Sequence, residues 1–196
     1  MMIHEMEQGT PEWFQCKLGK FSATDFQTLA NGRKDTIKKL IEKKAAEIIT
    51  GRRMETFKNS HMERGIELEA EARAEYEFYT GNEVREVGFI ELNKYIGCSP
   101  DGLIGDDGGV EFKSKDDNTH LHCLRFGDTS YKWQLYGNMW VSGRLWWDFV
   151  SYNPHFPVDK QLYIKRWERD EEEIKKISDG CDYAVEELKK ILKELK

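Results

Sequence analysis

A glycine-rich turn, Gly105-Asp106-Asp107-Gly108-Gly109, constrains the fold of this chain more than any other feature. The segments on either side of it, residues 95–104 and 110–115, have the composition of strands. Two strand-like segments joined by a short turn rich in Gly and Asp predict a β-hairpin. The hairpin in turn determines which side chains of its two strands face one another.

Hydrophobic periodicity predicts further helices and strands around the hairpin. Residues 36–50 carry apolar side chains at helical spacing and end at Gly51, where a left-handed C-cap is favoured. A capping-box pattern at Ser60 to Glu63 begins a second helix that runs to about Tyr79, and a strand follows over residues 84–92. After the hairpin we expect a helix over 128–142, strands over 145–152 and 161–167, and a long amphipathic helix from about Asp170.

The order of these elements predicts an α/β (α+β) fold with a mixed central sheet flanked by helices. No stretch is rich enough in Pro, Gly or Ser to form a linker, so we expect a single domain over residues 1–196. The aromatic cluster of Trp140, Trp146 and Trp147 is assigned to the core, because its elements must build that core.

Charge, cysteines and the first residues exclude several classes of protein. The net charge of −6 argues against coating nucleic acid by bulk electrostatics, so any DNA binding must be local. The cysteines lie far apart and form no C-x-x-C pair, which predicts reduced, mostly buried thiols and no zinc site or iron–sulfur cluster. A secretory signal and a membrane-spanning run are both missing from the sequence, so we expect a cytoplasmic protein with no membrane partner.

Acidic and basic side chains meet across the hairpin. Side chains two apart on a strand share a face, so Ser99 lies beside Asp101 and Glu111 beside Lys113. With the turn centred near Asp106, Asp101 faces Glu111 and Ser99 faces Lys113, with Cβ atoms roughly 5 Å apart. A bulge in the turn would shift this register.

Two carboxylates at this separation suit one hard divalent cation. Mg²⁺ takes oxygen ligands at roughly 2.0–2.1 Å, which Asp101, Glu111 and the Phe112 carbonyl would supply. Such an ion activates a bound water and offsets phosphate charge, while Lys113 holds the water and a phosphoryl oxygen. Glu-x-Lys alone is common on solvated strand faces, so the prediction depends on its combination with Pro100-Asp101 and the glycine-rich turn.

Pro100-Asp101 with Glu111-Phe112-Lys113 resembles the PD-(D/E)XK nuclease core, which has a restriction-endonuclease-like fold. Over most of the chain the surroundings resemble the phage lambda-type exonuclease, or YqaJ, family. Several motifs in the family's order are harder to obtain by chance than any one of them. The matching segments are Trp13, Lys17-Leu18-Gly19, Ser22-Ala23-Thr24, Gly65 with Glu69, Ala72-Arg73, Cys98 to Leu103, Gln134, and Met139-Trp140-Val141.

The resemblance implies roles for further residues. Glu69 is a further acidic member of the metal site, and Gln134 lines the same pocket. Lys17, Thr24 and Ser99 correspond to the family's pocket for a terminal 5′-phosphate. The family member compared here has arginine at the position of Lys17, so the bidentate fork is absent. On sequence alone, ordinary surface or packing roles for Glu69, Gln134 and Lys17 stay open.

Arg33 and Lys34 follow Asn31-Gly32 in the region where the family reaches into DNA. A basic loop suits contacts with phosphates or the minor groove. A solvated basic turn is the alternative for either residue alone.

The resemblance implies a Mg²⁺-dependent exonuclease, with Mn²⁺ as a substitute, that degrades linear double-stranded DNA from a 5′ end. It would release mononucleotides and leave a 3′ single strand for recombination by strand annealing. The implied partners are DNA ends, two further copies of the chain in a homotrimeric ring, and a phage single-strand annealing protein. The alternatives are a single-strand-specific or endonucleolytic PD-(D/E)XK nuclease and a non-catalytic DNA-binding module.

Overall fold

The central sheet has five strands, in the spatial order β2-β5-β6-β7-β8. The computed structural model describes residues 1–53 and 60–195, with side chains described from residue 68 onward in the second range. β6 and β7 run parallel and the other neighbours antiparallel, so the expected mixed sheet is confirmed. The strands are β2 (Val84–Arg85), β5 (Gly102–Ile104), β6 (Gly108–Ser114), β7 (Trp146–Tyr152) and β8 (Leu162–Glu168).

A second, three-stranded antiparallel sheet consists of β1 (Met2–His4), β3 (Phe89–Asn93) and β4 (Ile96–Cys98). The prediction of continuous strands over 84–92 and 95–104 was therefore wrong, because each segment is divided between the two sheets. At Gly88 a Cβ atom would lie 2.0 Å from the Met6 carbonyl oxygen, so the backbones approach closely where β2 and β3 separate. Pro100, which has no N–H to donate to a ladder, lies between β4 and β5.

The hairpin of β5 and β6 has the expected register. Gly102 pairs with Val110 and Ile104 with Gly108, so the turn is centred on Asp106. Continued by one residue, this register places Asp101 opposite Glu111. The expected pairing of Ser99 with Lys113 is not formed, because the chain leaves the sheet at Pro100.

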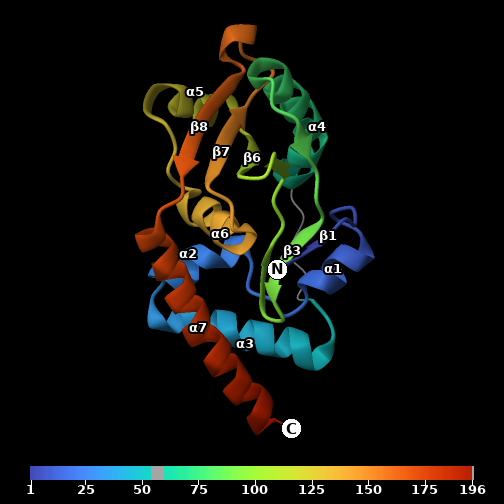
Figure 1. The fold of residues 1–196 in the computed structure, drawn as a ribbon, viewed down its shortest axis with the longest axis vertical. Coiled ribbons are helices and arrows are strands. Elements are labelled where there is room, and N and C mark those ends of the chain that lie inside the picture. Colours follow the sequence, from blue (N-terminus) through green and yellow to red (C-terminus); the bar gives the residue numbers. More distant parts are fainter. Residues whose placement is uncertain (54–59, 196) are drawn as a thin grey trace.

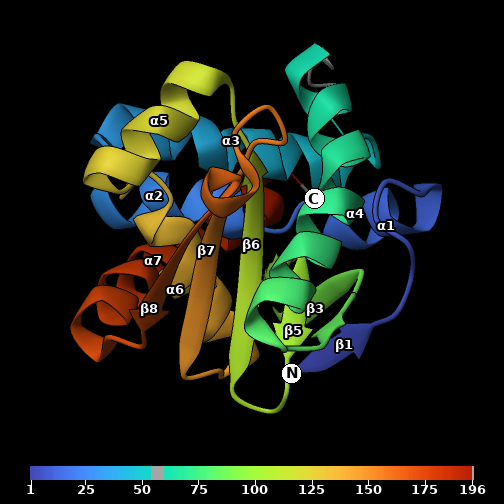
Figure 2. The same cartoon turned by 90° about the horizontal axis from the view of Figure 1, so that it is seen from above.

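Seven α-helices lie in the described ranges, and they cover both faces of the central sheet. The parallel pair β6–β7 requires a crossover connection, which contains α5 and α6. Figure 1 shows α2, α3 and α7 gathered at one end of the molecule, and in Figure 2 α4 lies on one side of β6. The helices are α1 (Pro11–Lys17), α2 (Ala23–Asn31), α3 (Lys34–Thr50), α4 (Ser60–Thr80), α5 (Asp117–Phe126), α6 (Lys132–Ser142) and α7 (Glu171–Glu194), with a short 3₁₀ helix at Val158–Lys160.

Most predicted helices are confirmed, with two differences. The helix expected over 128–142 begins only at Lys132, because Asp128 accepts from the Ser130 N–H and pairs with Lys115 at 2.8 Å. Helices α1, α2 and α5 and strand β1 were not predicted. Two sequence features lie where side chains are not described: the capping box at Ser60 to Glu63 and the Gly65 of the family motif. α7 begins as expected after Asp170, whose carboxylate accepts from the N–H groups of the first turn.

Two apolar clusters fill the space on either side of the sheet. In the larger cluster, apolar side chains of α2, α6 and α7 pack against the central sheet. Trp147, on β7, is fully buried in this cluster. The smaller one packs α4 against the other face, with Trp146 partly buried beside it. Trp140 is also packed against the larger cluster, so assigning these tryptophans to the core was correct. None of the described helices is both long and apolar enough to cross a membrane.

A buried polar network fastens α4 to the sheet. The Tyr76 hydroxyl donates to Asp148 Oδ2 at 2.6 Å, and Arg166 donates to both carboxylate oxygens of Asp148 at 2.9 Å. The Asn82 amide donates to the Tyr76 hydroxyl oxygen at 3.0 Å. Asp148 is only 2% exposed, so it depends on these donors for the hydrogen bonds that water would otherwise supply.

Tyr76→Phe should therefore lower the free energy of unfolding by about 1–3 kcal/mol, because it removes a donor from a buried carboxylate. Urea denaturation followed by circular dichroism measures this change. Tyr79→Phe is the matched control in the same helix, since Tyr79 is 77% exposed and its substitution should be nearly neutral. Equal effects of the two substitutions would contradict a stabilising role for the network.

Candidate active site

The predicted residues Asp101, Glu111 and Lys113 lie together at the end of the hairpin away from its turn. Asp101 Oδ2 accepts the Phe112 N–H at 2.7 Å, and Lys113 Nζ donates to Glu111 Oε1 at 2.5 Å. Successive side chains of β6 point to opposite faces of the sheet. The Phe112 ring lies on the face covered by α4, where it packs against Tyr76 with ring centroids 5.7 Å apart. Glu111 and Lys113 therefore face away from α4, toward α6.

Two amides from α6 hold the Glu111 carboxylate, which is only 1% exposed. Gln134 Nε2 donates to Oε1 at 2.5 Å, and Asn138 Nδ2 donates to Oε2 at 3.3 Å. The two amides are one helical turn apart on the same face of α6. The family resemblance predicted Gln134 but not Asn138, although an amide four residues after Gln134 in a largely apolar helix was a usable signal. Asn138 is fully buried.

Glu69 brings a third carboxylate to this site from α4. It pairs with Arg73 at 3.8 Å. Burial, reinforced by the nearby Asp101 charge, raises the pKa of Glu69 to about 7. Burial and Asp101 likewise raise the pKa of Glu111 to about 7. The pKa of Asp101 is also raised, because burial outweighs the opposing effects of Lys113 and of the Phe112 N–H.

These raised pKa values show that the three carboxylates do not readily carry negative charge together. Lys113 offsets part of that charge: burial alone would lower its pKa, but Glu111 and Asp101 raise it above its usual range. A bound divalent cation would favour the ionised carboxylates further. An oxygen donor set of this kind fits Mg²⁺ or Mn²⁺.

A second lysine that the sequence did not single out, Lys115, lies two residues after Lys113, just beyond the end of β6. Lys115 Nζ pairs with Asp128 at 2.8 Å. The ammonium groups of Lys113 and Lys115 lie 5.3 and 5.0 Å from the centroid of the Tyr131 ring. The spacing of two residues could have identified Lys115, but its ion pair with Asp128 could not be seen in the sequence.

Lys17 and Ser99 meet around Trp13, and Ser99 precedes the site residue Asp101 by two positions. The Trp13 indole N–H is within 2.9 Å of both Ser99 Oγ and the Gly88 carbonyl oxygen. Lys17 Nζ lies 3.8 Å from the centroid of the Trp13 ring, a cation–π contact. Burial lowers the pKa of Lys17 to about 8, with a further contribution from Arg53. Binding of an anion would favour the charged form of this lysine.

The other predicted DNA-binding residues are less directly connected to the site. Thr24 is exposed in the first turn of α2, next to Asp25, which pairs with Lys44 at 3.3 Å. Arg33 and Lys34 are exposed at the beginning of α3. In the part of the chain that the structure describes, their side chains form no hydrogen bond or ion pair with the carboxylates.

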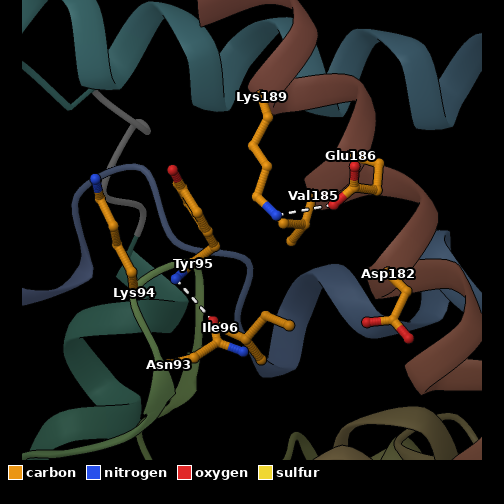
Figure 3. Close-up of a pocket in the computed structure, with 8 residues that line it drawn as sticks. All are labelled: Asn93, Lys94, Tyr95, Ile96, Asp182, Val185, Glu186 and Lys189. Carbon is orange, nitrogen blue, oxygen red and sulfur yellow. Dashed lines mark hydrogen bonds and ion pairs between the residues drawn. The ribbon is translucent and has the colours of Figure 1, made fainter.

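A separate surface pocket of about 400 Å³ lies between the β3–β4 turn and α7 (Figure 3). In it Lys189 donates to Glu186 at 2.8 Å, and Asn93 Oδ1 accepts the Tyr95 N–H at 2.9 Å. None of the predicted site residues lines this pocket. We therefore place the candidate active site at the carboxylates.

Comparison with known proteins identifies the family of the chain and several similar structures. Residues 12–145 match the YqaJ-like viral recombinase domain. No curated protein matches the chain. The alkaline exonuclease LHK-Exo from Laribacter hongkongensis is 34% identical, with a TM-score of 0.88 over 95% of this chain and 96% of that chain.

Two further structures are similar. LHK-Exo in complex with dAMP has a TM-score of 0.87, with the same 34% identity and coverage of 95% and 96%. A phage-related exonuclease from Haemophilus somnus 129PT shares the fold, with a TM-score of 0.72 at 17% identity over 90% of this chain and 96% of that chain.

Proposed function

The chain belongs to the YqaJ-like viral recombinase family, and from this membership and its carboxylate site we propose that it is a metal-dependent exonuclease acting on DNA. The observation that carries the proposal is the meeting of Glu69, Asp101 and Glu111 with Lys113 at one end of the hairpin. The similarity to LHK-Exo, an alkaline exonuclease with a structure in complex with dAMP, supports both the activity and the substrate class.

The finer proposal is 5′-to-3′ degradation of linear double-stranded DNA, which releases mononucleotides and leaves a 3′ single strand. That strand would serve phage-type recombination through a single-strand annealing protein. A single domain over residues 1–196 would carry the activity. The direction of degradation depends on the pocket around Trp13, which suits a terminal 5′-phosphate.

Asp101, Glu111, Glu69 and the Phe112 carbonyl would hold Mg²⁺, for which Mn²⁺ would substitute. When bound, the ion supplies a more acidic water and offsets the charge of the phosphodiester. Lys113 stays protonated and donates hydrogen bonds to the attacking water and to a phosphoryl oxygen.

The amides of α6 have a positioning role in this proposal. Gln134 and Asn138 each donate to one oxygen of Glu111, so the carboxylate is held in one orientation. A carboxylate held in this way does not have to reorient when substrate arrives.

Three polar side chains would bind the terminal phosphate. Lys17 supplies the positive charge, and the hydroxyls of Ser99 and Thr24 donate to phosphate oxygens. Arg33 and Lys34, which are exposed at the start of α3, would contact the DNA backbone or minor groove.

Digestion of linear duplex DNA tests the activity directly. With Mg²⁺ the wild-type chain should degrade linear but not circular duplex, and EDTA should stop it. Lys113→Ala should reduce turnover about 10²–10³-fold, because it removes a donor to the developing charge. Lys193→Ala, at an exposed lysine in the last turn of α7, is the matched control and should retain full activity.

Other outcomes of this assay select the alternatives. Cutting of circular duplex would favour an endonuclease, and digestion of single strands alone would favour a repair-type nuclease. DNA binding without cleavage, independent of Mg²⁺ and of Lys113, would mean that the chain is a non-catalytic module.

Lys17→Arg should increase the preference for a 5′-phosphate over a 5′-hydroxyl end by about tenfold, because the guanidinium can add one charge-assisted hydrogen bond. Lys17→Met should reduce the same preference. The ratio of kcat/KM on the two substrates measures both effects. An unchanged ratio in both variants would mean that Lys17 does not contact the terminal phosphate.

By family resemblance we also propose a homotrimeric ring that encloses the DNA. A single chain has a mass of 23.1 kDa, so analytical ultracentrifugation should give three times this value at working concentration. A monomer mass would contradict the ring without affecting the assignment of the carboxylate site.

A further inference from the structure

Three side chains with metal-binding atoms meet outside the carboxylate site, on β1, α1 and β3. They are His4, Cys16 and Glu91, and one ligand atom from each lies within 4.8 Å of the others. His4 Nε2 is 3.4 Å from Glu91 Oε2. Nitrogen and oxygen ligands of a tetrahedral zinc ion, each about 2.0–2.2 Å from the metal, lie roughly 3.3–3.5 Å apart. The spacing of His4 and Glu91 therefore already fits one edge of such a tetrahedron.

The second observation is the state of the His4 ring. Its Nε2 atom is buried and forms no hydrogen bond among the described residues, although the side chain is 24% exposed and this atom lies at ion-pair distance from Glu91. Buried polar atoms in native proteins are normally satisfied by a protein group, a water or an ion. Nε2 instead faces the Glu91 carboxylate at a separation that a shared metal ion would bridge. An ion between them would satisfy both side chains.

We propose that His4, Cys16 and Glu91 bind a divalent transition metal ion of the zinc type. Their nitrogen, sulfur and oxygen atoms suit such an ion, whereas Mg²⁺ prefers the all-oxygen set at Asp101 and Glu111. With three protein ligands, the fourth position would be taken by water. Sequence analysis excluded a zinc site because the cysteines are scattered, but here folding brings one cysteine to ligands from distant segments.

Binding requires the Cys16 thiol to lose its proton. Burial raises the pKa of this thiol, so the side chain is protonated when no cation is present. Coordination replaces the thiol proton with the metal ion, and the proton is released to solvent. Lys20 Nζ lies 3.8 Å from Glu91 Oε2 and competes with the ion for this carboxylate.

The site would brace the N-terminal part of the fold. β1 and β3 are already paired through backbone hydrogen bonds, whereas no backbone hydrogen bond joins α1 to either strand among the described residues. A metal ion shared by Cys16, His4 and Glu91 would tie α1 to both strands. Because α1 also carries Trp13 and Lys17, the ion would hold the pocket around Trp13 in place.

Titration of the full chain with Co²⁺ in the presence of excess Mg²⁺ tests the proposal. A thiolate-to-cobalt absorption band should appear and saturate at one ion per chain. Cys16→Ser should abolish the band. Cys123→Ser, at a buried cysteine outside the cluster, and Glu111→Gln, at the carboxylate site, should both retain it. Wild-type protein without the band, or a band that survives Cys16→Ser, would overturn the proposal.

Lys20→Met gives a test in the opposite direction. Removal of the competing ammonium should tighten Co²⁺ and Zn²⁺ binding severalfold, whereas a purely structural Lys20–Glu91 ion pair predicts no such gain. Zn²⁺ should also raise the Tm of the wild-type chain but not that of Cys16→Ser. Weaker binding in Lys20→Met, or an equal Tm increase in Cys16→Ser, would count against the site. These measurements do not depend on nuclease activity, so they can fail while the proposed function stands.

Discussion

The burial of the Glu111 carboxylate is the constraint on which the rest of the site depends. A carboxylate that is 1% exposed must replace its lost water with fixed donors, and Lys113, Gln134 and Asn138 provide them. This requirement explains why α6 carries amides where a core helix would otherwise be apolar. α6 can supply these amides because the crossover connection between the parallel strands β6 and β7 contains this helix. The crossover connection therefore also supplies the hydrogen-bond donors of the polar site.

The architecture could be predicted from the sequence where the signals were local. The glycine-rich turn determined the register around Asp106, helical periodicity identified α3 and α7, and a capping-box pattern identified α4. The division of the sheet could not be predicted in this way, because strand-like composition continues through both breaks. At Gly88 the break depends on the approach of Met6, which is distant in sequence. A contact between residues so far apart in sequence forms only in the folded chain, so the sequence pattern cannot predict the break.

The site residues also divide into those predicted from local sequence signals and those brought together only by folding. Asp101, Glu111 and Lys113 share one hairpin, so their proximity followed from strand geometry alone. Glu69 was assigned only through family resemblance, because nothing local connects α4 to the hairpin. The cluster of His4, Cys16 and Glu91 has no sequence signature at all, since its members come from three separate elements. A motif search finds ligands at characteristic spacings and overlooks clusters that tertiary structure assembles.

The break at Pro100 has a consequence for product length. Ser99 and Asp101 flank this proline, so a separation of only two residues along the backbone joins the proposed phosphate pocket to the proposed cleavage centre. Two residues of extended chain span at most about 7 Å, which is a covalent limit and not a matter of side-chain adjustment. On the proposed assignment, the protein backbone serves as a ruler between the end of the DNA strand and the bond that is cut. On the same assignment, each cut would release a product of fixed length.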